Sequence, residues 1–232
     1  MQLKRHLPKM HPIIFITVFV LIGLWLQWAL NTPNIDQLFF SHSGFLLLGI
    51  CGAIFANATG AGGGVIFIPA FSALGFTPTE AISTSFLIQC FGMTAGSMTW
   101  CHYYFKQHHQ DDSWQGFPVM VACCALFSIS GFWTSQFASL SAPVSLHVSF
   151  SVFSIVLGAI IIINSRKKTT QHSLTSFKNS ALRDCMFLSG LSFVGGIITA
   201  WLSVGVGEII VIYLMLRGYC TKLAIATGVV VS

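Results

Sequence analysis

The sequence has little charge. Of its 232 residues only 7% are Asp, Glu, Lys or Arg, whereas about 25% is typical of a soluble domain. Hydrophobic residues make up 54%, and only short polar connections separate the apolar runs. No stretch could form a soluble domain. The composition therefore indicates an all-α integral membrane protein whose main partner is the lipid bilayer.

Several chemical motifs are also absent. The chain has no His-Glu-x-x-His, no intramembrane pair of aspartates and no G-x-S-x-G, so we expect no enzyme activity and no cofactor. The seven cysteines are odd in number and form no C-x-x-C pair, which argues against a disulfide framework or a zinc site. Residues 101–112 hold three His and two Asp, but their spacing matches no defined metal site. A solvated cytoplasmic loop is the simpler interpretation.

What the chain has instead is a series of apolar runs, several of which reach the ~20 residues needed to cross a ~30 Å hydrocarbon core. The first is longer than the apolar part of a signal peptide and has no A-x-A site after it, so we expect a transmembrane helix, with a cleaved signal as the alternative. The predicted helices are 13–30, 44–59, 65–75, 81–100, 117–136, 144–164, 186–202, 206–216 and 223 onward.

The basic residues predict the topology. Cytoplasmic loops are enriched in Lys and Arg, and all eleven fall on one face if the N-terminus is cytoplasmic and the chain reverses direction at residues 60–64. The net charge of +5 then reflects the enrichment of Lys and Arg in cytoplasmic loops of a protein in the cell (inner) membrane. No nucleic-acid partner is expected. The cytoplasmic groups are Lys4, Arg5 and Lys9; Lys106; five residues in 165–184; and Arg217 with Lys222.

The proposed reversal lies in a glycine run. Residues 57–69 read NATGAGGGVIFIP, with four glycines in five positions. The segment 65–75 would form about 16 Å of helix, half the hydrocarbon thickness, which favours a break partway through the membrane. Non-helical backbone at that depth is tolerated only where it is buried in protein or lines a wet cavity. The alternative is a glycine-rich contact between packed helices.

A shift of 143 residues aligns this run with a second one. GAGGGVIFIPAFSALGFTPTEAISTSF (60–86) lies over SVGVGEIIVIYLMLRGYCTKLAIATGV (203–229) without a gap. The threading gives the two copies opposite orientations, which is the plan of inverted-repeat transporters. We therefore predict an extra N-terminal segment (1–43), a first repeat (44–164), a cytoplasmic linker (165–184) and a second repeat (185–232). About three helices of the second copy are missing, so we expect it to be incomplete.

These residues resemble the sulfite exporter TauE/SafE family of bacterial membrane transporters, over about 44–232. The resemblance implies two repeats of transmembrane helices that move sulfite, sulfonates or other small organosulfur anions. It also places Thr84 and Ser85 near the transport path. The bland interpretation of both is hydrogen bonding to carbonyls of their own helix.

The glycine runs suggest how an anion could bind without a formal positive charge. Free N–H groups at a helix N-terminus attract anions, and glycine lets a ligand approach the backbone. Glu208, which replaces the counterpart of Val65, is the only acidic residue in an apolar run, and we expect it to carry a proton in coupled transport. The candidate substrate-binding residues are Asn57, Gly60, Gly62, Gly63, Gly64, Thr84, Ser85, Gly205, Gly207 and Thr227.

The function expected is secondary transport, in the export direction, of a small anion such as sulfite or a sulfonate. A passive anion channel and a truncated, non-transporting membrane protein are the alternatives. A homo-oligomer is compatible with the sequence.

Overall fold

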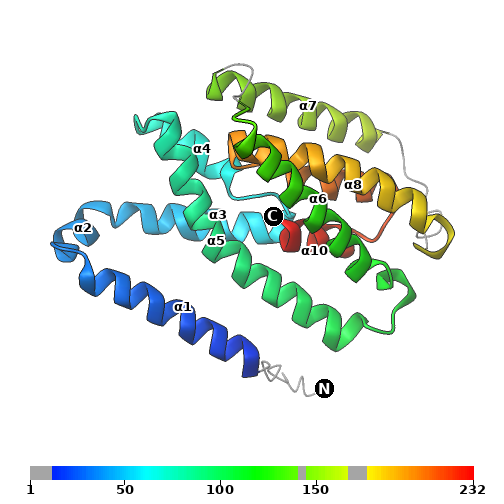
Figure 1. The fold of residues 1–232 in the computed structure, drawn as a ribbon, viewed down its shortest axis with the longest axis horizontal. Coiled ribbons are helices and arrows are strands. Elements are labelled where there is room, and N and C mark those ends of the chain that lie inside the picture. The colour runs from blue at the N-terminus through cyan, green and yellow to red at the C-terminus, as the bar shows by residue number, and fades with distance from the viewer. Residues whose placement is uncertain (1–11, 141–144, 167–176) are drawn as a thin grey trace. The chain divides into compact units, whose positions relative to one another are not determined.

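The computed structural model describes residues 12–140, 145–166 and 177–232, and within them every regular element is helical (Figure 1). The helices are α1 (Pro12–Asn31), α2 (Ile35–His42), α3 (Gly44–Thr59), α4 (Gly64–Ala73), α5 (Pro78–Tyr103), α6 (Phe117–Phe137), α7 (Leu146–Arg166), α8 (Phe177–Leu202), α9 (Val206–Leu216) and α10 (Thr221–Val231), with a π-helical turn at Tyr104–His108 and a 3-10 turn at Asp112–Trp114. Residues 1–11, with three of the predicted cytoplasmic cations, and the middle of the predicted linker lie outside the described part.

Two elements differ from the sequence prediction. Helix α2 lies in a connection that was expected to be irregular, because Asp36 and other polar residues interrupt its apolar pattern. Pro33 lacks an N–H and ends α1 just before it. Helix α8 begins at Phe177, inside the predicted linker, because the polar first turns of this helix do not belong to its apolar run.

The chain divides into two compact units, Met1–Leu48 and Gly49–Ser232. In the first unit, α1 and α2 meet at a bend of 112°. The second unit contains the two glycine runs and all the candidate site residues, so the candidate site lies within a single compact unit.

The second unit is held together by close helix contacts. Helices α6 and α8 run side by side (Figure 1). A Cβ atom on Gly131 would collide with the carbonyl oxygen of Phe193, and one on Gly196 would collide with that of Ser128. Small residues are the usual means by which membrane helices approach this closely. Helix α10 packs against both α5 and α9, so the end of the second copy contacts the first copy.

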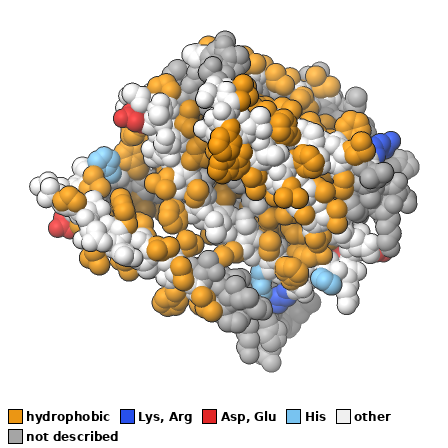
Figure 2. Space-filling view, viewed as in Figure 1, with side chains coloured by type: hydrophobic (Ala, Val, Ile, Leu, Met, Phe, Trp, Pro, Cys, Tyr) orange, Lys and Arg blue, Asp and Glu red, His pale blue; other side chains and the backbone are white. Residues whose placement is uncertain are grey.

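The surface is that of a membrane protein. Within the described residues, two helical stretches, Asp112–Phe137 and Arg183–Leu202, are long and apolar enough to cross a bilayer, and the bent α1–α2 pair could form a third span. Large apolar side chains such as Leu126 and Met186 are each 69% exposed. Hydrophobic side chains are spread over the face shown in Figure 2, where charged ones are few. Helix α5 is also long, with 26 residues, but it carries several Ser, Thr and Gln side chains and is not among these apolar spans.

Several helix boundaries recur at a spacing of 143 residues in the segments around the two glycine runs. In each, a helix ends, an irregular segment follows, a short helix ends at a glycine with positive φ, and another helix begins. Gly75 and Gly218 have φ angles of 82° and 81°, a conformation that glycine adopts without strain. The corresponding positions, all 143 residues apart, are Thr59 and Leu202, Ala73 and Leu216, Gly75 and Gly218, and Pro78 and Thr221.

Candidate functional site

The first glycine loop connects α3 to α4. Gly60 has a φ of 76°, and the hydroxyl of Thr59 accepts a hydrogen bond from the N–H of Ala61 at 3.2 Å. Thr59 also donates to the carbonyl of Phe55, so its side chain satisfies backbone groups at the end of α3. This matches the capping role that such a threonine offers at a helix end.

The second glycine loop connects α8 to α9. Ser203 and Gly205 have φ angles of 56° and 148°, which interrupt the helical backbone between α8 and α9. The hydroxyl of Thr199 accepts the N–H of Val206 at 3.1 Å, which satisfies one of the first amides of α9. Ser203 and Gly60, which both have positive φ, occupy equivalent positions in the two copies.

The two loops pack directly on each other. A Cβ atom on Gly64 would collide with the carbonyl oxygen of Ser203, and one on Gly207 would lie 2.5 Å from the carbonyl oxygen of Gly60. These contacts are reciprocal, because Gly60 corresponds to Ser203 and Gly64 corresponds to Gly207. Reciprocal contact between equivalent surfaces is the property of a two-fold interface. The loops therefore pack on each other through positions that correspond under the 143-residue shift.

Glu208 joins the two loops through hydrogen bonds. Its Oε1 accepts a hydrogen bond from the N–H of Gly62 at 2.9 Å, and its Oε2 accepts one from the N–H of Gly205 at 2.8 Å. Gly62 and Gly205 are equivalent positions, so each copy contributes the same amide. The side chain is buried, with Glu208 6% exposed. A carboxylate thus bridges two backbone donors inside the protein.

A polar network continues from this carboxylate to α5. The side-chain amide Nε2 of Gln89 donates to the hydroxyls of Ser203 at 2.8 Å and Ser85 at 2.9 Å. The Ser203 hydroxyl in turn donates to that of Ser85 at 3.0 Å. Oε1 of Gln89 lies next to Gly62, 2.8 Å from where a Cβ atom would stand. Gln89 therefore touches both glycine loops.

A cleft of about 570 Å³ opens beside Glu208. Its walls come from α5, the second glycine loop, Gly62 and the end of α10. Glu208 is the only Asp, Glu, Lys or Arg among the described residues that line it, and the remaining polar lining consists of Gln, Ser, Thr and Cys side chains and of backbone. The cleft is large enough for a small oxyanion with several water molecules.

The structure brings only some of the predicted site residues to this cleft. Gly62, Gly205, Gly207 and Glu208 line it, and Ser85 reaches it through Gln89. Gly60, Gly63 and Gly64 serve the packing of the first loop, against α9 and α10, Phe67 and the second loop respectively. The other three predicted residues, Asn57, Thr84 and Thr227, do not line the cleft.

Asn57 and Thr227 have local partners instead. The amide of Asn57 donates to the carbonyl of Ala53 at 2.8 Å, and its side chain packs on Gly96 of α5. The hydroxyl of Thr227 donates to the carbonyl of Leu223 within α10. Thr84 is half-buried on α5.

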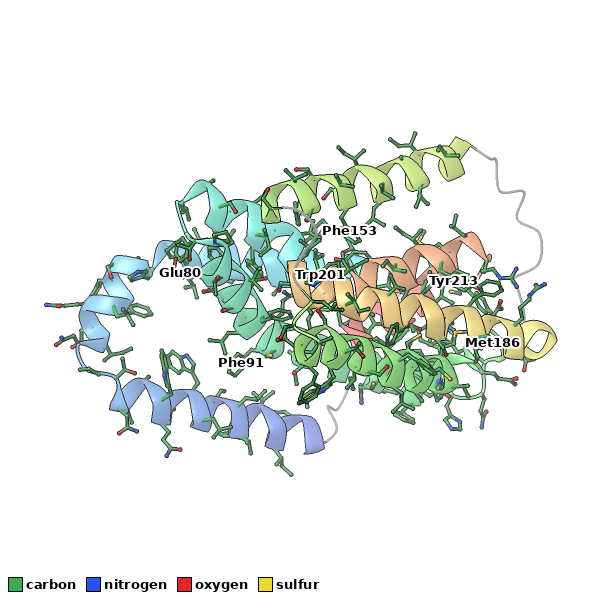
Figure 3. The ribbon with its side chains drawn as sticks, turned by 45° about the horizontal axis from the view of Figure 1, so that its top comes forward. Glu80, Phe91, Phe153, Met186, Trp201 and Tyr213 are labelled. Carbon is green, nitrogen blue, oxygen red and sulfur yellow. The ribbon has the colours of Figure 1, made fainter. Side chains whose placement is uncertain are left out.

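Sequence reasoning missed a second buried carboxylate, Asp184 on α8. It accepts hydrogen bonds from Nε of Arg217 at 3.0 Å and from the hydroxyls of Tyr219 and Tyr213, the latter labelled on α9 in Figure 3. Asp184 lies in the range predicted as a polar linker, where a charged side chain is expected to contact water. Its partners Arg217 and Tyr219 lie 33 and 35 residues further along the chain, in the turn after α9, so no local sequence pattern reveals the pairing.

These features define a multi-pass helical membrane protein with a buried carboxylate between two packed glycine loops. The sequence profile of the sulfite exporter TauE/SafE family matches residues 45–232, and the chain belongs to this family, which is a family of membrane transporters. No curated protein and no solved structure gave a match.

Proposed function

We propose that the protein is a secondary transporter that exports a small inorganic or organic anion such as sulfite or a sulfonate. One observation carries the proposal: an anionic group, the Glu208 carboxylate, is bound between the equivalent amides of Gly62 and Gly205. The profile match points to the same class of substrate.

Backbone amides suit this task in a membrane. Aligned N–H groups near a helix N-terminus stabilise negative charge through hydrogen bonds and the helix dipole. A lysine or arginine would bind the anion more strongly, but it would also have to be buried when the site is empty, at a large desolvation cost. Two amides and neighbouring Ser and Gln side chains can bind an anion without a buried lysine or arginine. An anion held this way can leave again.

The inverted repeat is part of the proposal. Helix ends that recur at 143-residue intervals and the reciprocal contact of the loops support two related copies, 44–164 and 185–232, flanked by 1–43 and 165–184. The distribution of Lys and Arg supports opposite orientations, with breaks at the glycine runs and a cytoplasmic N-terminus in the inner membrane. Thr84, Asn57 and Thr227 would then belong to the path or to its supporting helices.

Single cysteines in a cysteine-free background test this orientation. Gln107 and Ala138 are exposed near opposite ends of α6. An impermeant thiol reagent applied to intact cells should label Ala138→Cys, and should label Gln107→Cys only after the membrane is permeabilised. The reverse pattern would refute the proposed topology.

Glu208 is proposed as the proton-binding group of the transporter. A carboxyl group inside a membrane protein that can exchange with water through a cleft is suited to carry a proton between the two sides. Transport by the wild type should therefore respond to a pH gradient, whereas Glu208→Gln should transport without that response.

Proteoliposomes containing the purified protein test the function. We expect a pH gradient to drive sulfite against its own concentration gradient, which a passive channel cannot do. Glu80→Gln, which changes an exposed glutamate at the start of α5, serves as the control and should keep wild-type coupling. Flux no higher than in empty liposomes, for sulfite and for simple sulfonates alike, would refute the transport proposal.

A further inference from the structure

We propose that the Glu208 carboxylate is a tethered competitor of the substrate: it occupies the oxyanion's own binding site, and an anion takes the amides of Gly62 and Gly205 only when the carboxylate leaves. This inference rests on the proposed function. It adds that the site is filled by the protein itself when no substrate is bound.

The geometry of Glu208 differs from that of an ordinary helix cap. Glu80 shows the ordinary arrangement at the start of α5 (Figure 3), where its carboxylate accepts the N–H and hydroxyl of Thr77 three residues earlier. Glu208 makes the equivalent bond with its Oε2, to the N–H of Gly205. Its other oxygen accepts the N–H of Gly62, 146 residues away in the other copy. Capping α9 does not require that second bond.

The first copy shows that the repeated fold does not depend on a carboxylate at this position. Val65 stands where Glu208 stands in the second copy, and α4 still begins within one residue of the equivalent place. The acidic side chain is thus an addition to one copy, directed at the point where equivalent amides from both copies face the same space. Two carboxylate oxygens match the two amide donors, and two oxygens of a sulfite or sulfonate group offer the same arrangement.

The cleft gives the displaced carboxylate a place to go. Glu208, Gly62 and Gly205 all line it, so the side chain can turn away from the amides without crossing the packed loops. The groups facing Glu208 there are Gln89 on α5 and Ser203 and Thr199 near the end of α8, which are uncharged, and the other titratable groups of the lining are the thiols of Cys90 and Cys101. The described lining contains no Lys, Arg or His that could neutralise a second negative charge.

Proton and anion binding are therefore coupled. If a monoanion binds while Glu208 remains ionised, two negative charges share a site without a cation, and each disfavours the other. If Glu208 takes a proton as it leaves, the net charge of the site stays at minus one. The proton comes from water in the cleft and is returned when the anion departs and the carboxylate re-forms its two hydrogen bonds.

Anion binding to purified protein in detergent tests this inference. Glu208→Ala frees both amides, and we expect it to bind sulfite at least tenfold more tightly than the wild type, with chloride at equal ionic strength as the reference. Sulfite should also raise the Tm of Glu208→Ala by several degrees, because it replaces the acceptors that the variant lost. The wild type and the matched control Glu80→Ala should respond weakly and alike.

A second variant keeps the test valid if Glu208→Ala does not fold. Glu208→Gln keeps one acceptor oxygen, so it should bind sulfite with an affinity between those of the wild type and Glu208→Ala. Wild-type transport combined with equal or weaker binding by both Glu208 variants would overturn the competitor role and leave the transport proposal standing. Absence of binding and transport in every form would instead overturn the proposed function.

Discussion

Asp184 ties α8 to the turn that follows α9. Its side chain is fully buried, and Nη2 of Arg217 lies 2.9 Å from the same Oδ1 that accepts the Nε hydrogen bond. A buried carboxylate is stable only when charged and polar donors compensate for the lost water. Here the donors are Tyr213 near the end of α9 and Arg217 and Tyr219 just after it, so a single residue fixes this part of the chain to α8.

We expect Asp184→Asn to lower the free energy of unfolding by about 3 kcal/mol, because it leaves the partly buried Arg217 without its counter-ion. Unfolding of the purified protein in detergent, followed by circular dichroism, measures this change. Asp111→Asn is the control. Hydrogen bonds from the backbone N–H and hydroxyl of Ser113 keep the pKa of Asp111 below its ordinary value, so this substitution also removes a charge.

The control should change stability less, because the Asp111 pair with His108 is only half-buried, whereas Asp184 is fully buried. Equal stability of Asp184→Asn and the wild type would show that the buried cluster is dispensable.

Glu208 shows which properties of a single residue can be predicted from the sequence. An isolated acid in an apolar run is conspicuous in the sequence, and its burial was predictable. Its partner was not, because Gly62 lies 146 residues away and the two meet only through packing of the loops. The same limit applies to Gln89, whose bonds to Ser203 cross from one copy to the other.

At the scale of helices, the sequence predicts boundaries well where local chemistry defines them. The predicted segments 44–59 and 206–216 coincide with α3 and α9, because glycines end the apolar runs there. The Thr77–Glu80 capping box and Pro78 explain why α5 begins at Pro78, three residues before the predicted apolar run 81–100. Helix α2 and the first turns of α8 were missed, since their polar residues look like connections to any method that follows apolar runs.

A substitution at Gly64 tests the contact between the two glycine loops. The missing side chain of Gly64 lets the start of α4 rest on the carbonyl of Ser203, a backbone atom that cannot move aside alone. We expect Gly64→Ala to destabilise the protein by roughly 1–3 kcal/mol, the range for overpacking, and to reduce anion transport more than tenfold.

Gly190→Ala is the matched control, because this glycine lies exposed on α8 and a Cβ atom there would meet nothing within 4 Å. It should keep wild-type transport and gain up to about 1 kcal/mol from better helix propensity. Thermal unfolding and proteoliposome flux of both variants check the pair. Wild-type flux in Gly64→Ala would contradict a functional role for the loop contact.

For the molecule as a whole, composition predicts the membrane environment and the repeat predicts that two similar hairpins exist. Neither predicts how the two glycine loops pack on each other, because that contact depends on the absence of a side chain at a few glycines. The reciprocal packing of Gly64 on Ser203 and of Gly207 on Gly60 supplies that information. It places two equivalent amides around one carboxylate, which makes the meeting point of the copies the centre of the proposed mechanism.

A crystal structure of Glu208→Ala grown with selenite, an oxyanion that resembles sulfite and scatters anomalously, tests this account most directly. We predict one selenium peak between the loops, with selenite oxygens within hydrogen-bonding distance of the nitrogens of both Gly62 and Gly205. Selenite bound only elsewhere, with these two amides donating to other protein groups, would contradict the account.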